Sequence, residues 1–269
     1  VDPKTLGFEP YLWKWLNERP DKAQAAGLKT LFAKYCQKTI SFVVEGLLPT
    51  GEYFPKPAVI VPCTELNYAM QMCSMLEAIL TEDKQINEPN QLECILIFCI
   101  VWSVGGTLIE SARPAFDKFL KEMSGVPVSS SKSVGIGSLP GSAPTLWDYY
   151  FNESMMRWVN WQDEVKEYEH VPGMPFSSIL VPTVDTVCFT YHLQWNLNIF
   201  RPVLYSGDVG TAKTVTIQNF LKNLSPDKFT SVNINFSSRT TSLALQRNLE
   251  SNVEKRTKDT YGPAGGKKL

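Results

Sequence analysis

The feature that most constrains the fold of this chain is a short loop with two glycines, placed between an apolar segment and a helix-forming one. The loop reads Gly-Asp-Val-Gly-Thr-Ala-Lys-Thr and covers residues 207–214. An apolar segment at 202–206 has the composition of a buried strand, and a helical pattern runs through 214–224. A strand, a glycine loop and a helix in this order predict a phosphate-binding loop.

Each residue type in this loop has a chemical role in holding a nucleotide. Gly207 and Gly210 let backbone N–H groups converge without obstruction by a Cβ atom, and the helix N-terminus adds partial positive charge. We expect Lys213 to reach the β- and γ-phosphates and the Thr214 hydroxyl to coordinate Mg²⁺. The common pattern has glycine before the lysine. Ala212 occupies that position here. Its methyl group is tolerated if the residue keeps a negative φ, and a lowered nucleotide affinity is the alternative.

The composition is that of a globular chain long enough for two domains. The 269 residues are 43% hydrophobic and 20% charged, with a formal net charge of −1. This charge gives no overall field that favours nucleic acid or an anionic membrane, and we expect neither as a partner. Residues 201–269 nevertheless carry 11 basic and 5 acidic side chains, which suits an anionic ligand there. A solvated basic face is the alternative.

Membrane, secretion and metal chemistry find little support in the sequence. The longest apolar run, 95–104, is too short to span a bilayer and predicts a buried helix. The first residues lack the basic and apolar regions of a signal peptide. Six cysteines are scattered without a Cys-x-x-Cys pair, which favours a reducing compartment. The only two histidines, His170 and His192, cannot form a zinc cluster, and we interpret both as structural.

The first part of the chain, residues 1–125, predicts a helical subdomain. Apolar residues recur at helical spacing in 25–47, and Thr64 is placed to begin another helix. The segment 91–103 is apolar on all sides, as in the central helix of a bundle. Residues 126–145 are rich in Gly, Ser and Pro, so we expect an exposed linker and a domain boundary there.

Residues 146–269 predict the beginning of an α/β domain. The expected elements are strands at 202–206 and 230–236 and helices at 187–197, at 214–224 and, capped by Ser238, at about 240–256. Alternation of strand and helix is typical of a parallel sheet. The predicted fold class is therefore α + α/β, a helical bundle followed by the N-terminal part of a phosphate-loop α/β subdomain.

Taken together, these segments resemble the axonemal dynein heavy chains. Residues 207–221 resemble the phosphate loop of the third AAA+ module of these motors, and 179–186 resemble its adenine-side segment. Further similarity lies at 235–241 and 261–263 in the third module, and at 1–7 and 102–106 for the second module. The resemblance covers nearly the whole chain, and the alanine at position 212 favours axonemal over cytoplasmic dynein.

The resemblance implies a place for each part. Residues 1–125 would be the small helical subdomain of the second module, 126–145 a linker, and 146–269 the incomplete large subdomain of the third. The implied function is that of an ATP-driven microtubule motor of the ciliary axoneme, within the cytoplasm and cytoskeleton, with a regulatory nucleotide site here. ATP or ADP and Mg²⁺ are the implied cofactors. The implied partners are neighbouring AAA+ modules of the same chain and, through the full-length protein, the microtubule and dynein light and intermediate chains.

The candidate site combines the loop with the adenine-side segment. Val181 and Pro182 form an apolar, proline-stiffened stretch before the loop, and we expect them to face the adenine. Thr214 is the expected Mg²⁺ ligand. The full nucleotide-binding set is Gly207, Asp208, Val209, Gly210, Thr211, Ala212, Lys213, Thr214, Val215, Val181 and Pro182.

The residues needed for hydrolysis are not found in the sequence. Hydrolysis needs an acidic strand end that binds Mg²⁺ and a carboxylate that orients water. No apolar strand ending in Asp or Glu follows Lys213, and the chain stops at Lys268-Leu269, where the family's acidic strand would begin. We therefore expect a piece of a longer protein that binds nucleotide, contains no catalytic residue and does not hydrolyse ATP in isolation.

Two other functions remain open at this point. A stand-alone phosphate-loop kinase or NTPase is one, although the Asn-Lys-x-Asp motif of GTPases is absent and a kinase needs lid arginines and more sheet. A structural module that holds nucleotide permanently is the other. The sequence does not separate it from a regulatory site.

Overall fold

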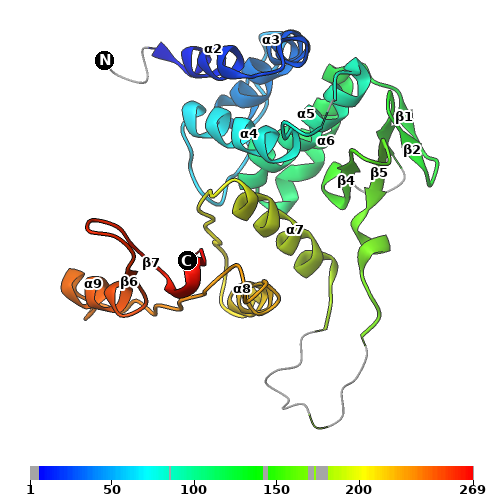
Figure 1. Ribbon diagram of the computed structural model, residues 1–269. Coiled ribbons are helices and arrows are strands. Elements are labelled where there is room, and N and C mark those ends of the chain that lie inside the picture. Colours follow the sequence, from blue (N-terminus) through cyan, green and yellow to red (C-terminus); the bar gives the residue numbers. More distant parts are fainter. Residues whose placement is uncertain (1–5, 85, 142–144, 169–172, 174–180, 269) are drawn as a thin grey trace. The chain divides into compact units, whose positions relative to one another are not determined.

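The computed structural model describes the chain except for residues 1–5, 85, 142–144, 169–172, 174–180 and 269 (Figure 1). Its contacts divide the chain into two compact units, Val1–Thr211 and Ala212–Leu269. The helices of the first unit are α2 (Glu9–Glu18), α3 (Lys22–Glu45), α4 (Glu65–Ile79), α5 (Pro89–Ser103), α6 (Arg113–Ser124) and α7 (Val184–Asn198). Its strands are β1 (Val128–Ser129), β2 (Val134–Gly135), β3 (Leu139–Pro140), β4 (Tyr149–Asn152) and β5 (Arg157–Asn160). The second unit holds α8 (Lys213–Lys222), α9 (Ser242–Glu250), β6 (Glu254–Lys255) and β7 (Tyr261–Gly262).

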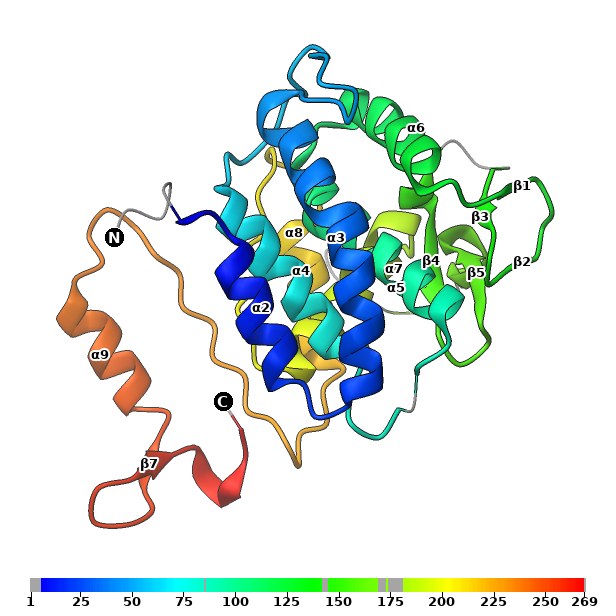
Figure 2. The ribbon, with the colours of Figure 1, turned by 90° about the horizontal axis from the view of Figure 1, so that it is seen from above.

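The first unit is built around α5, which is buried on nearly every side. Helices α3 and α4 pack against it, and α2 packs on both, so that α2, α3 and α4 lie side by side in Figure 2. This confirms the central helix predicted at 91–103 and the helical bundle around it. Among the described residues, Pro89–Thr107 is the one helical stretch apolar and long enough to cross a membrane, and 72% of its most apolar part is buried.

The helix boundaries follow from side chains that satisfy the free backbone groups at helix ends. The Asp21 carboxylate accepts two backbone N–H groups of the first turn of α3, at 2.9 and 3.0 Å. Helix α3 ends at Gly46, whose φ of +77° suits glycine and where a Cβ would collide with the carbonyl oxygen of Phe54. Thr64 and Asn67 form a reciprocal capping box at α4, which confirms the start predicted at Thr64.

The stretch 126–145 is not the exposed linker that its composition predicts. Strand β1 pairs in parallel with β3, and β2 joins β4 and β5 in an antiparallel three-stranded sheet. Val134 and Leu139 are 2% and 0% exposed and belong to the core, and the Trp158 indole donates to the carbonyl of Ser138 at 3.1 Å. Most of the Gly, Ser and Pro residues lie between these short strands, while Val134 of β2 and both residues of β3 are buried. Because so few apolar residues of this stretch reach the core, the sequence shows no periodic apolar pattern that would predict the strands.

Helix α7 joins the same core through an aromatic seam. The seam comprises Phe98, Trp102, Trp161, Tyr191, His192 and Trp195. The ring centroid of His192 lies 4.3 Å from that of Trp102, and the centroids of Trp161 and Tyr191 are 5.1 Å apart. Helix α7 also packs against α4. The helix predicted around 187–197 is therefore confirmed, and the interpretation of His192 as a structural residue fits its place in the seam.

The second unit carries little regular sheet. The strand expected at 230–236 is not formed. Phe229 pairs in parallel with Lys268, and the N–H of Thr230 donates to the Lys268 carbonyl at 2.8 Å. This is an isolated bridge, and none of the described strands pairs with the residues after Thr230.

Helix α9 is shorter than the helix expected at about 240–256. It begins after Thr241, whose hydroxyl accepts the N–H of Ala244 at 3.2 Å, so Ser238 is not the cap. It ends near Glu250 because polar side chains take over the last carbonyl groups. Asn252 Nδ2 and Ser251 Oγ both donate to the carbonyl of Asn248, at 2.7 and 2.8 Å.

The aromatic seam predicts an acid-sensitive stability. The His192 residue keeps some exposure, but its Nε2 atom is buried without a hydrogen-bond partner among the described residues, and burial lowers the pKa of His192 to about 3. An unfolded histidine titrates near 6.5, so the unfolded state binds a proton below that pH while the folded state does not. The resulting stability is complete above pH 6.5 and is lost as the pH falls towards 3.

We expect the free energy of unfolding of the wild type to drop by about 1–2 kcal/mol more between pH 7 and pH 5 than that of His192→Phe. Phenylalanine keeps an aromatic ring in the seam and removes the titration. Urea unfolding of both proteins at the two pH values measures the difference. An equal drop in both would show that His192 does not take up a proton on unfolding.

Candidate nucleotide-binding loop

The first part of the loop, residues 207–211, closes the first unit and is exposed. The Thr211 hydroxyl donates to the carbonyl of Asp208 at 2.9 Å, which makes a local turn. Gly210 lies within this turn with a φ of +85°, where a side chain would be strained. The side chain of Val209 is fully exposed, so it contributes to no core in this unit.

The strand expected at 202–206, before the loop, is not formed. Val203 and Leu204 are 40% and 86% exposed, and none of the described strands pairs with this segment. A strand of a parallel sheet requires neighbours on its edges and cover on its faces, and the segment has neither here. It is instead held to α7 by Tyr205, whose hydroxyl donates to the carbonyl of Phe189 at 2.9 Å and whose ring meets the Phe189 ring edge-on at 5.8 Å.

The second part of the loop opens the second unit as the start of α8. Lys213 is the first residue of this helix, and Thr214 and Val215 follow it on the exposed side. The buried face of the helix is formed by Thr216 and Phe220, at 4% and 7% exposure. The helix predicted at 214–224 is thus confirmed, with its start moved back to the lysine and its end at Lys222.

Ala212 is the N-cap of α8 and adopts the left-handed conformation, with a φ of +56°. The condition under which its methyl group is expected to be tolerated, a negative φ, is therefore not met. Ala212 offers no side-chain acceptor to the free N–H groups of the first turn. A helix N-terminus carries partial positive charge and is a common place for an anion to bind.

The expected adenine-side residues precede α7. Val181 is 52% exposed and Pro182 is partly buried. Thr183 and Thr186 form a capping box directly after them, with the Thr186 N–H donating to the Thr183 hydroxyl at 3.2 Å. The capping box fixes where the apolar segment ends and the helix begins. Residues 179–180 lie outside the described residues, and the adenine contact itself stays a prediction.

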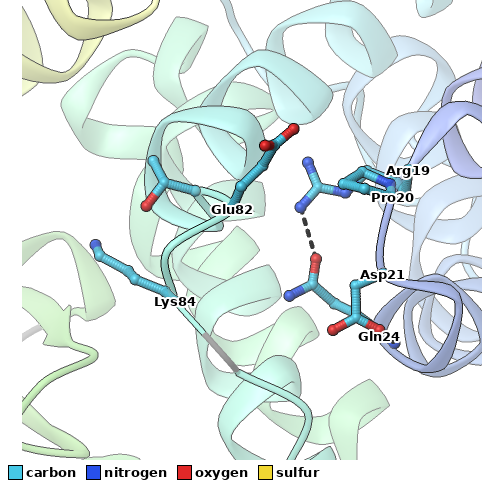
Figure 3. A pocket seen from close by; sticks show the side chains of 7 residues that line it. Arg19, Pro20, Asp21, Gln24, Glu82 and Lys84 are labelled. Carbon is cyan, nitrogen blue, oxygen red and sulfur yellow. Dashed lines mark hydrogen bonds between the residues drawn. The ribbon is translucent and has the colours of Figure 1, made fainter.

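A cavity of about 280 Å³ lies elsewhere in the first unit, between the corner of α2 and α3 and the end of α4 (Figure 3). It is lined by Arg19, Pro20, Asp21, Gln24, Thr81, Glu82 and Lys84. Arg19 donates to the Gln24 amide oxygen at 2.6 Å, and Lys84 pairs with Glu153 at 2.6 Å. Because its cations have partners and two carboxylates share the lining, this cavity does not favour a phosphate group.

Metal and thiol chemistry gain no support from the described part of the chain. Within it, no cluster of three or more His, Cys, Asp or Glu side chains could hold a metal ion. All six cysteines are free and five are buried. Burial raises the pKa of the Cys36 and Cys73 thiols, which disfavours the reactive thiolate. These cysteines therefore act as small apolar core residues, as their sequence context predicts.

Sequence reasoning missed two features of the site. One is the Tyr205–Phe189 contact, which attaches the segment before the loop to α7. A single tyrosine in an apolar run does not indicate which residue it will contact. The other is the left-handed Ala212. The pattern did contain this second signal, because a position that is commonly glycine is often one with a positive φ.

Two family models match the chain. The dynein heavy chain AAA lid domain matches residues 28–163, and the P-loop containing dynein motor region matches residues 168–269. The first match includes most of α3, the helices α4 to α6 and the β2-β5-β4 sheet, and the second includes the candidate loop. The two matches fit an α + α/β arrangement, as the sequence predicts.

Similar curated proteins include axonemal dynein heavy chains. The chain is 44% identical over 271 residues to dynein axonemal heavy chain 10 of Homo sapiens. It is 38% identical over 273 residues to the dynein-1-alpha heavy chain of the flagellar inner arm I1 complex of Chlamydomonas reinhardtii, and 31% identical over 276 residues to dynein axonemal heavy chain 2 of Mus musculus. Each alignment covers 100% of this chain and 6% of the relative. With the lid-domain match over half of its length, this chain belongs to the dynein heavy-chain family.

Proposed function

We propose that residues 207–214 bind Mg-ATP or Mg-ADP as a regulatory nucleotide site of an axonemal dynein motor. The observation that carries the proposal is the start of α8. Lys213 and Thr214 begin this helix directly after a glycine turn, so the lysine, the threonine hydroxyl and the positive end of the helix come together in one turn. This start lies inside the region matched by the P-loop containing dynein motor region. Backbone N–H groups and the lysine would hold the phosphates, as in other loops of this kind.

The roles of the other residues in the site follow from the chemical groups that their side chains and backbone offer. Thr214, exposed in the first turn, would supply one oxygen ligand to a Mg²⁺ ion that takes its others from phosphates and water. Val181 and Pro182 would face the adenine, since they form the apolar segment before α7. Asp208, Val209, Thr211 and Val215 would contribute mainly through the backbone.

The wider setting comes from the relatives. Their names place them in axonemes and in a flagellar inner arm, so we propose the ciliary axoneme for this chain as well. Within the longer protein, its partners would be the neighbouring AAA+ modules. The microtubule and the dynein light and intermediate chains would be partners through the full-length motor.

We also propose a division between modules that differs from the one expected at 126–145. The lid domain would extend to about residue 163, where the first family match ends. Strands β4 and β5 support this, because Phe151 and Trp158 are buried in the same core as the bundle. The large subdomain of the third module would then begin after this point, near 168.

The proposed phosphate contact predicts the effect of Lys213→Ala. The lysine makes charge-assisted contacts worth about 1.5–3 kcal/mol each, so its loss should weaken nucleotide binding at least tenfold. Titration of the 269-residue chain with fluorescent ADP measures the dissociation constant. Lys222→Ala, in the last turn of the same helix, is the matched control and should bind like the wild type. Equal affinities for the two variants would overturn the assignment.

The proposed magnesium ligand gives a second prediction. Thr214→Val should remove most of the gain in nucleotide affinity that Mg²⁺ produces, because valine keeps the shape of threonine and lacks the oxygen ligand. Thr214→Ser should keep that gain. The measurement is the ratio of ADP dissociation constants with Mg²⁺ and with a chelator. A ratio unchanged in Thr214→Val would exclude Thr214 as the ligand.

The residues present predict binding without turnover. Of the acidic residues after Lys213, none follows an apolar strand, and Glu254 lies in a two-residue antiparallel pair. Without a carboxylate that orients water, the isolated chain should release no phosphate from ATP above background. A phosphate-release assay with wild type and Lys213→Ala tests this. Turnover that disappears in the Lys213 variant would contradict the prediction.

A further inference from the structure

The residue directly before the lysine of the loop is held in an unfavourable backbone conformation. Ala212 has φ and ψ of +56° and +11°. Among the described residues, the only other non-glycine residues with positive φ are Met156 and Phe200, both at +53°. In this region the Cβ atom of an L-residue crowds the following carbonyl oxygen, which glycine avoids.

Hydrogen bonds within α8 hold Ala212 in this left-handed conformation. The Ala212 carbonyl accepts two hydrogen bonds from Thr216, one from its backbone N–H and one from its hydroxyl, both at 2.9 Å. Thr216 is itself buried, at 4% exposure. The carbonyl of Ala212 is thus part of the first turn of α8. If the residue relaxes to a negative φ, the peptide turns away and these two bonds are lost together.

We propose that Ala212 lowers the nucleotide affinity of this loop by opposing the conformation that presents the first turn of α8 to phosphate. This inference rests on the proposed function and concerns the regulation of the same site. Only molecules with Ala212 in the left-handed conformation are competent to bind, and the apparent affinity falls by the fraction of molecules in that conformation. The site releases nucleotide more readily than the same loop with glycine, which suits a site that senses nucleotide concentration.

The test is the substitution Ala212→Gly in the 269-residue chain. Glycine removes the penalty for positive φ, so the dissociation constant for fluorescent ADP should fall about five- to tenfold. Ala212→Val should weaken binding relative to the wild type, because a β-branched side chain is still less compatible with positive φ. Thermal unfolding of each variant shows whether the fold is retained.

Met156→Gly is the matched control. It relieves a positive φ of nearly the same size in the turn between β4 and β5, outside the proposed site. It should leave the ADP dissociation constant unchanged. This comparison separates an effect on the loop from a general gain in stability, since both substitutions relieve backbone strain of similar origin.

The outcomes are distinct. Tighter binding by Ala212→Gly alone supports the inference. Wild-type binding that depends on Lys213 and is unchanged in Ala212→Gly would overturn the inference and leave the proposed function standing. Equal tightening in Ala212→Gly and Met156→Gly would also overturn it. The absence of Lys213-dependent binding in every variant, Ala212→Gly included, would overturn the proposed function and this inference with it.

Discussion

The burial of α5 is the constraint on which the first unit depends. A helix that is apolar on all sides must be covered on all sides, and no single neighbouring element can do this. Helices α3 and α4 provide part of the cover, and the β4 strand, the 3-10 helix at Leu146–Asp148 and the aromatic residues of α7 provide more. The position of each of these elements follows from the face of α5 that it covers. The need to cover α5 also places α7, the helix that precedes the candidate loop in the sequence.

The helical part of the fold was predictable because its signals are local. Thr64 caps α4 through contacts three residues apart, and the apolar character of 91–103 requires burial whatever the partner. The sheets were not predictable in the same way. Val134 pairs with Trp158 and Leu139 with Val128, and no local pattern records either pairing. The strands expected at 202–206 and 230–236 have the right composition, but a strand exists only when another pairs with it.

The candidate site shows a similar division. The order of glycine turn, lysine and threonine could be read from the sequence, because the residue types follow directly from phosphate chemistry. The conformation of Ala212 could not be derived from side-chain size, which is small enough to fit. It accompanies the two hydrogen bonds that Thr216 makes to the Ala212 carbonyl, and these depend on the helix that follows. A residue can thus match the chemical pattern of a loop and still be held in a backbone conformation that its residue type disfavours.

The aromatic seam has a consequence for how such chains are divided. The lid-domain match ends at residue 163, whereas His192 and Trp195 lie within the motor-region match that begins at 168. A protein cut between the two matched regions would expose the rings of Phe98 and Trp102 that α7 covers. Exposed aromatic surface of this kind promotes self-association. In this chain the boundary between the two family matches does not coincide with the boundary of the first compact unit, because α7 lies in the motor-region match and packs on α4 and α5.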